Sequence, residues 1–98
     1  MARVKINYFG LIQNIVDNRE EEVDLLGETT VKELLRSLVQ KYGDDFRSMI
    51  LTPDWQLLVT TVIYLDERDI SEIDGIETNL RDGSTLNITV IAHVAVGG

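Results

Sequence analysis

The residues best suited to chemistry are the last eight, 91–98, with the sequence IAHVAVGG. They contain no Asp, Glu, Lys or Arg. Glycine lacks a Cβ and orders at a high entropic cost, so a Gly-Gly end is poor at making structure. It is well suited to carrying the carboxylate of Gly98 on a thin, uncharged arm into a narrow active site. The alternative interpretation is a frayed tail that happens to end in glycine.

The residues around Gly98 fit the chemical interpretation. The side chains of Val94, Ala95 and Val96 are uncharged and can be desolvated in a channel without burying an unpaired charge. A side chain at position 97 or 98 would narrow the approach to the acyl carbon, and glycine leaves it open. We therefore predict Gly97 and Gly98 as the reacting residues, and Val94, Ala95 and Val96 as contacts with a partner.

Composition narrows the classes of function. The 98 residues, 44% of them hydrophobic, suit one domain with a real core. A formal net charge of -8 argues against nucleic acid as a partner and favours basic protein surfaces. The sequence has no cysteine, which excludes disulfides, thiolate catalysis and zinc–thiolate sites. No metal site is predicted.

Targeting signals are not apparent in the sequence. The first residues lack the apolar stretch of a signal peptide, and no run approaches the ~20 apolar residues of a membrane helix. The lack of cysteine fits a reducing compartment. We therefore expect a cytoplasmic protein that does not contact a membrane.

The clearest predicted element is an amphipathic helix that begins after Thr30 and ends before Gly43. Thr30 and Glu33 have the spacing of a capping box, and Gly43 supplies a left-handed stop. Apolar residues recur at helical spacing and define a stripe for one face of a sheet: Val31, Leu34, Leu35, Leu38, Val39 and Tyr42. Docking onto a partner is the alternative use of that stripe.

Alternating or β-branched segments predict strands elsewhere. The predicted strands span 3–9, 21–26, 57–65 and 86–91, with a further short edge strand beginning at Ile70. Residues 11–16 have helical spacing for a turn or two, and 44–56 is a connecting region with a short helical turn before Pro53. Trp55 either caps the edge of the core or is an exposed anchor for a partner.

The resulting order, β-β-α-β-(short β)-β, predicts an α+β fold with one main helix on one face of a mixed four- to five-stranded sheet. By analogy with known folds, the last strand runs parallel beside the first at the sheet centre. We expect a single domain, 1–98, in which 92–98 is a flexible C-terminal tail.

In this order the segments resemble the ubiquitin-like β-grasp sulfur carriers of the MoaD/ThiS type, and most closely the MoaD-like small subunit of molybdopterin synthase. The similar segments are 4–11 (VKINYFGL), 30–35 (TVKELL), 80–83 (LRDG) and the final Gly-Gly pair. Two features differ from the family pattern. Ala92 and His93 stand where prolines are common, and Val96 stands where alanine is usual. His93 is either a proton shuttle or a tolerated polar residue.

The resemblance implies a function in which the chain is not catalytic alone. An adenylyltransferase of the MoeB/ThiF type, related to ubiquitin-activating enzymes, would adenylate Gly98 with ATP and magnesium. Sulfur would then convert Gly98 to a thiocarboxylate, with no cofactor bound permanently to the carrier. The acceptor would be a pterin precursor on the MoaE-type large subunit of molybdopterin synthase, in molybdenum or tungsten cofactor biosynthesis.

Three other interpretations remain open. The chain is alternatively a protein modifier that forms isopeptide bonds through Gly98, or a sulfur carrier for cysteine or another metabolite. The third is a plain interaction module whose tail has no chemical role.

Overall fold

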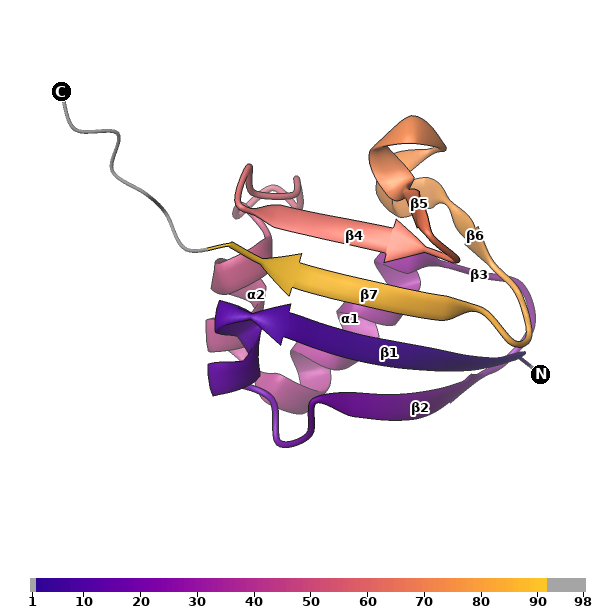
Figure 1. Ribbon diagram of the computed structural model, residues 1–98, viewed down its shortest axis with the longest axis horizontal. Coiled ribbons are helices and arrows are strands. Elements are labelled where there is room, and N and C mark those ends of the chain that lie inside the picture. Colours follow the sequence, from indigo (N-terminus) through magenta and orange to yellow (C-terminus); the bar gives the residue numbers. More distant parts are fainter. Residues whose placement is uncertain (1, 92–98) are drawn as a thin grey trace, which may run out of the picture.

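A mixed sheet of five strands, in the order β2-β1-β7-β4-β5, forms one layer, and two helices cover one of its faces (Figure 1). The computed structural model describes residues 2–91. In chain order the elements are β1 (Ala2–Gly10), the 3-10 helix η1 (Leu11–Asn14), β2 (Glu20–Leu25), β3 (Thr29–Thr30), α1 (Val31–Tyr42), α2 (Asp44–Ile50), β4 (Thr61–Leu65), β5 (Arg68–Asp69), the 3-10 helices η2 (Ile70–Glu72) and η3 (Gly75–Glu77), β6 (Asn79–Leu80) and β7 (Thr85–Val90). The predicted α+β class and the mixed sheet are confirmed.

The centre of the sheet is the parallel pair β1–β7, as predicted. Lys5 is opposite Thr85 at one end of this pair, and Gly10 is opposite Val90 at the other. On its other side β7 pairs antiparallel with β4, and β1 pairs antiparallel with β2. The last described strand is therefore held on both sides along its whole length.

Helix α1 forms where the capping signals place it. The Thr30 side chain accepts a hydrogen bond from the backbone N–H of Glu33, 3.3 Å away. At the other end Gly43 has φ 90° and ψ -170°, so the residue has the positive φ expected of a stop but an extended ψ instead of a left-handed helical one. Both ends of the helix are thus determined by local sequence.

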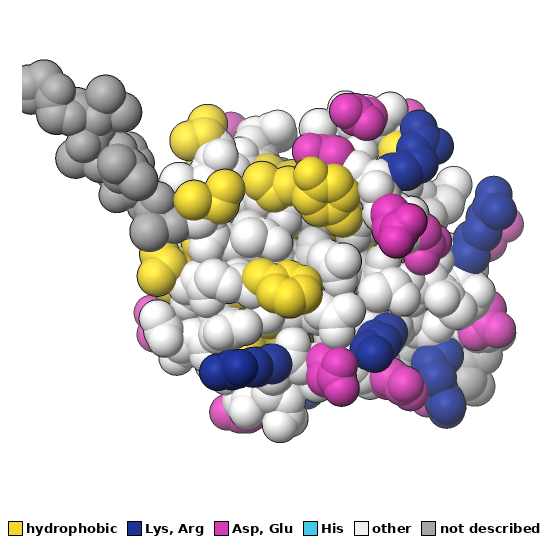
Figure 2. Space-filling view, viewed as in Figure 1, with side chains coloured by type: hydrophobic (Ala, Val, Ile, Leu, Met, Phe, Trp, Pro, Cys, Tyr) yellow, Lys and Arg dark blue, Asp and Glu magenta, His cyan; other side chains and the backbone are white. Residues whose placement is uncertain are grey.

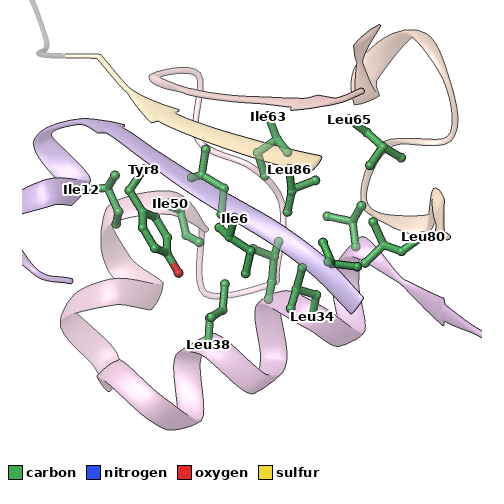
Figure 3. Packing of buried hydrophobic residues seen from close by; sticks show 14 of the residues in the cluster. Ile6, Tyr8, Ile12, Leu34, Leu38, Ile50, Ile63, Leu65, Leu80 and Leu86 are labelled. Carbon is green, nitrogen blue, oxygen red and sulfur yellow. The ribbon is translucent and has the colours of Figure 1, made fainter. Parts of the chain in front are cut away.

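The core lies between α1 and the inner face of the sheet (Figure 3). The predicted helix stripe is buried at Val31, Leu34, Leu35 and Leu38. It packs against the alternate, inward-facing residues of the central strands, which are Val4, Ile6 and Tyr8 of β1, Ile63 and Leu65 of β4, and Leu86, Ile88 and Val90 of β7. The core-packing interpretation of the stripe is confirmed.

Three elements differ from prediction. Strand β4 begins at Thr61 and not at Leu57, because the Thr61 N–H bonds the carbonyl of Leu58 in a turn while Leu57 bridges to Leu51. Ile70 begins η2 and not an edge strand, since Asp69 caps the N–H of Ser71. The predicted helical turn in the connecting region is a full helix, α2.

Trp55 caps the edge of the core, the preferred of its two interpretations. It is partly buried against the core, and the Arg36 guanidinium lies 5.8 Å from the centre of its ring. Within residues 2–91, neither α-helix has the length and hydrophobicity needed to cross a bilayer.

Candidate functional site

The predicted reacting residues Gly97 and Gly98 lie outside the described residues. So do the predicted contact residues Val94, Ala95 and Val96, the tail 92–98 as a whole, and His93 within it. The structure does describe the end of β7 from which the chain continues towards them. The described part of the candidate site is therefore the surroundings of Val90 and Ile91.

The end of β7 is fixed by hydrogen bonds on both sides. Val90 is paired with Gly10 of β1 and with Thr61 of β4. Beyond the strand, the backbone N–H of Ile91 donates to the carbonyl oxygen of Thr60 over 2.9 Å. The position of the chain is therefore set up to Ile91, one residue past the last strand.

Gly10 permits an unusually close approach at this point. It has φ 75° and ψ -146°, a conformation that side chains strongly disfavour. A Cβ on Gly10 would lie 2.1 Å from the carbonyl oxygen of Val90, which is backbone and cannot move aside by a rotamer change. The absence of a side chain at position 10 is thus required for β1 and β7 to remain paired where β7 ends.

Exposed apolar side chains surround the end of β7. We call them, together with Tyr64 farther back along β4 opposite Asn87, the β7-end patch: Phe9, Leu11, Val59, Tyr64 and Ile91. Phe9 lies on the outer face of the sheet and is 46% exposed, while Val59 in the loop before β4 is 97% exposed. Figure 2 shows apolar side chains gathered over this part of the sheet and most charged ones towards the opposite end of the strands. Exposed apolar groups collected in this way are typical of a protein interface.

The same face becomes polar and then charged away from the patch. In its middle the Asn7 side-chain amide donates to the Asn87 side-chain oxygen over 2.9 Å. At the far end Arg3 donates to Asp24 over 3.0 Å, and Lys5 lies 3.4 Å from Glu20. One face of the sheet therefore offers an apolar end and a charged end.

On the inner face, the carboxylate of Glu21 joins β2, β1 and α1. It accepts hydrogen bonds from the Tyr8 hydroxyl over 2.9 Å, from the Lys41 ammonium over 2.8 Å and from the Tyr42 hydroxyl. The rings of Tyr8 and Tyr42 pack edge to face with centres 6.4 Å apart. The Glu21 side chain is only 10% exposed, so this cluster closes the side of the core.

The titration behaviour of the cluster follows from these contacts. Burial favours the neutral form of Glu21, but the hydrogen bonds from Lys41, Tyr42 and Tyr8 outweigh it and lower its pKa. Burial, reinforced by the Glu21 charge, raises the pKa of the Tyr8 hydroxyl. Every acidic or hydroxyl group in the cluster is bonded to another member, which indicates a structural role and not a catalytic one.

No metal centre is formed by the described part of the chain. Among residues 2–91, His, Cys, Asp and Glu side chains nowhere gather in the groups of three or more needed to hold an ion. The chemistry predicted for the tail does not require one within this chain.

Sequence analysis missed the β7-end patch. The signal at Phe9 was available, since an aromatic residue stands in the outward register of a strand that otherwise exposes Lys5 and Asn7. For Val59 the sequence predicted burial, because its β-branched neighbours indicated a buried strand. That prediction for Val59 is wrong, because the chain turns before β4 and exposes it.

Comparison with protein families matches this chain to the ThiS family. The model of the ThiS family matches residues 6–95, which covers nearly the whole chain and continues past the end of β7. No curated protein matches the sequence.

Solved structures with the same fold are similar over nearly their full length. The small archaeal modifier protein 1 of Haloferax volcanii has a TM-score of 0.79 at 17% identity, with 94% of this chain and all of that chain covered. A candidate molybdopterin converting factor, subunit 1, from Pyrococcus furiosus has a TM-score of 0.74 at 18% identity, with 94% and 100% covered.

A third structure with this fold is a complex. The BexX/CysO complex of Amycolatopsis orientalis gives a TM-score of 0.71 at 21% identity, with 97% of this chain and 99% of that chain covered. At these identities the likeness concerns the fold, which is the ubiquitin-like β-grasp. With the family model matching from β1 to beyond β7, the chain belongs to the ThiS family of ubiquitin-like sulfur carriers.

Proposed function

We propose that this protein carries sulfur as a thiocarboxylate on Gly98 and donates it in molybdopterin biosynthesis, as the small subunit of a molybdopterin synthase in the cytoplasm. The observation that carries the proposal is the ThiS family match to residues 6–95, which reaches the segment directly before Gly97 and Gly98. The Pyrococcus furiosus structure of the same fold is named for a molybdopterin converting factor, and this favours the pterin pathway.

The chemistry requires a partner enzyme. A carboxylate is a poor electrophile, and adenylation by an enzyme of the MoeB/ThiF type gives Gly98 a good leaving group with release of pyrophosphate. A sulfur nucleophile then attacks the acyl carbon and AMP leaves. The partner holds ATP and magnesium, while this chain contributes the acyl group and a surface by which it is recognised.

The β7-end patch supplies such a surface. Burying Phe9, Tyr64 and Val59 against a partner would release free energy that helps to offset the cost of ordering a glycine-ended segment, about 1–2 kcal/mol per residue. We propose that the adenylyltransferase and a MoaE-type large subunit both dock on this patch, with Val94, Ala95 and Val96 entering the partner's active site.

A second candidate is supported by the Haloferax volcanii structure, which is named as a modifier protein. In that case the activated Gly98 would be joined to lysines of other proteins. The only lysines of this chain are Lys5, Lys32 and Lys41, so it offers few acceptors for chains of itself. Delivery of sulfur to cysteine or another metabolite would use the same first steps and a different acceptor.

The decisive experiment is the intact mass of the chain isolated from its host with the activating enzyme present. A gain equal to the replacement of one oxygen by sulfur, located on Gly98 by fragmentation, supports the carrier. Isopeptide linkage of Gly98 to lysines of other proteins supports the modifier. If neither form is detected, both functions are contradicted and an interaction module remains.

Deletion of Gly98 is the matched control. The deletion should abolish both forms and leave the melting temperature nearly unchanged, because residues 2–91 supply the core. Addition of purified large subunit and pterin precursor to the thiocarboxylated chain then tests the acceptor. Sulfur loss from Gly98 that depends on both additions identifies the molybdopterin pathway.

A further inference from the structure

Strand β2 is an open edge of the main sheet (Figure 1). On β1, the backbone groups of Arg3 and Lys5 bond towards the β7 side, to residues Gly83 and Ser84. The N–H and C=O groups of successive residues point to opposite sides of a strand. Arg3 and Lys5 therefore form non-hydrogen-bonded pairs with their partners on β2, Asp24 and Glu22.

On β2, Glu20, Glu22 and Asp24 lie opposite Asn7, Lys5 and Arg3, respectively. The backbone N–H and C=O groups of these three residues therefore point away from β1, towards the open edge of the sheet. A row of such groups is a template on which another strand can pair.

A groove opens beside the end of this edge, next to Asp24, Leu25 and Leu26. It has a volume of about 650 Å³ and lies between the last part of β2 and helix α1. Leu25 and Leu26 line it from the strand side, and Arg36, Ser37 and Gln40 line it from the helix side. Leu26 is 83% exposed, so an apolar side chain is already presented to whatever enters the groove.

The charged side chains along the β2 edge favour one kind of added strand over another. The side chains of Glu20, Glu22 and Asp24 follow one another on the outer face, where Arg3 and Lys5 of β1 pair with them. Lys32 and Arg36 of α1 lie at the groove on the inner side. Figure 2 shows acidic and basic side chains along this edge. A strand added to β2 would place its own outward side chains about 5 Å from these carboxylates.

A second copy of this chain does not fit the edge. Antiparallel pairing of two β2 strands would bring Glu20, Glu22 and Asp24 against the same three acids, and like charges directly opposite are destabilising. A strand with lysine or arginine at alternate positions reverses that sign. Its other side chains would point into the groove, where Leu26 favours aliphatic ones.

We propose that the β2 edge is a second docking site, distinct from the β7-end patch, which binds an extended segment of another protein by strand addition. The bound segment alternates lysine or arginine, facing Glu20, Glu22 and Asp24, with aliphatic residues that face the groove. The backbone supplies the affinity, and the alternate side chains supply the specificity.

The test uses the full chain and a capped synthetic peptide of alternating lysine and valine, about six residues long, the usual length of a strand. Amide exchange followed by NMR should show new protection at Glu20, Glu22 and Asp24 when the peptide binds. The inward-bonded amides of Glu21 and Val23 should change little, because they are already in the sheet. A counterpart peptide of glutamate and valine should not bind.

Two substitutions at one position separate backbone pairing from charge. Glu22→Pro removes one outward N–H at a position where an edge strand tolerates proline, and it should weaken binding at least about tenfold. Glu22→Gln keeps the N–H and removes the charge, and should weaken binding about two- to fivefold. Glu72→Gln, on η2 near the opposite edge, is the control and should have no effect.

The results that overturn the proposal are equally definite. Binding that is lost in salt without new protection at Glu20, Glu22 and Asp24 would be nonspecific charge attraction. Equal affinity of the Glu22→Pro and unmodified proteins, no binding of the lysine–valine peptide, or formation of a dimer through β2 would each contradict it. The exchange measurement on the unmodified chain decides the matter even if the proline variant folds poorly.

Discussion

The two ends of the outer sheet face are built on the same strands and have opposite character. Along β1 the outward residues run from Arg3 and Lys5 through Asn7 to Phe9, from charged to polar to aromatic. Ile91, directly after β7, extends the apolar end, and Tyr64 on β4 lies beside the polar middle, opposite Asn87. The period of two explains which face each residue occupies, but it does not explain this gradient along the face.

The gradient agrees with the function proposed above. The apolar end lies beside Ile91, from which the chain continues to Gly97 and Gly98, so the proposal predicts that an activating partner covers this end. The charged end remains solvated and can orient the chain during approach, since exposed charges affect the rate of encounter more than the affinity. Substitutions at both ends of this face and at the inward-facing Glu21 probe the gradient, and the expected losses decrease from Gly10 to Arg3.

Gly10→Ala should be the most damaging change at the apolar end. It forces a side chain into the φ 75° conformation and places a Cβ against the Val90 carbonyl oxygen, so we expect a loss of about 3 kcal/mol or more in the free energy of unfolding. Urea denaturation measures it. Gly75→Ala is the control, because Gly75 has φ 59° but no atom within 4 Å of the added Cβ, and should lose only about 1 kcal/mol. Equal losses would show that the close approach to Val90 is unimportant.

Phe9→Glu should remove the apolar character of the patch without unfolding the chain, because Phe9 is on the outer face. We expect kcat/KM for adenylation to fall about 30-fold, equivalent to about 2 kcal/mol of lost docking. Lys5→Gln, on the same strand and face at the charged end, is the matched control and should change it less than about threefold. A larger effect at Lys5 would reverse the roles assigned to the two ends.

Glu21→Gln tests the one acid of β2 that is turned inwards. It should destabilise the chain by about 1–2 kcal/mol, because two tyrosine hydroxyls and Lys41 lose a charged acceptor. The pKa of Glu21 is lowered on folding, so near its ordinary pKa the unfolded state binds more protons than the folded state.

The resulting stabilisation is complete above about pH 4.5, the ordinary glutamate pKa, and is lost as the pH falls through the lower pKa of the folded state. The difference in unfolding free energy between the two proteins should therefore shrink in acid. Glu20→Gln is the neighbouring exposed control. A difference independent of pH would mean that packing, and not the charge of Glu21, holds the cluster.

Arg3→Ala should have the smallest effect on the free energy of unfolding, close to the precision of the measurement. Its side chain is 65% exposed and its partner Asp24 is 53% exposed, so the Arg3–Asp24 ion pair is screened by solvent. Thermal melts at low and high salt check this, and the small difference between the two proteins should disappear in high salt. A loss as large as that at Glu21 would show that the charged end is structural.

Much of the fold could be predicted because its signals are local. Helix α1 is predicted from residues within its own segment: the cap at Thr30, Glu33, and the apolar spacing from Val31 to Tyr42. The parallel pairing of β1 with β7 was predicted only by analogy with known folds, because nothing local to either strand selects its partner. Region 57–60 was predicted wrongly because β-branched residues favour strands in general, and the turn at Leu58–Thr61 depends on contacts made elsewhere.

The candidate site divides in the same way. The Gly97–Gly98 pair is a prediction from residue type, and it lies outside the described residues. The β7-end patch could not be predicted, because Phe9, Val59 and Ile91 are far apart in the sequence and come near the end of β7 only when β1, β7 and β4 pair. Glu21 resembled its neighbours Glu20 and Glu22 in the sequence, and only the sheet register turned it inwards to Tyr8.

Residue types and their local spacing are enough to predict the chemistry proposed for Gly98, the capped helix α1 and the alternating strands, because each depends on residues a few positions apart. What surrounds the end of β7, which acid of β2 turns inwards and which edge of the sheet stays open depend on the fold. Those properties arise from pairing between distant segments, whose free energy is shared across the whole sheet and is not encoded in any one of them.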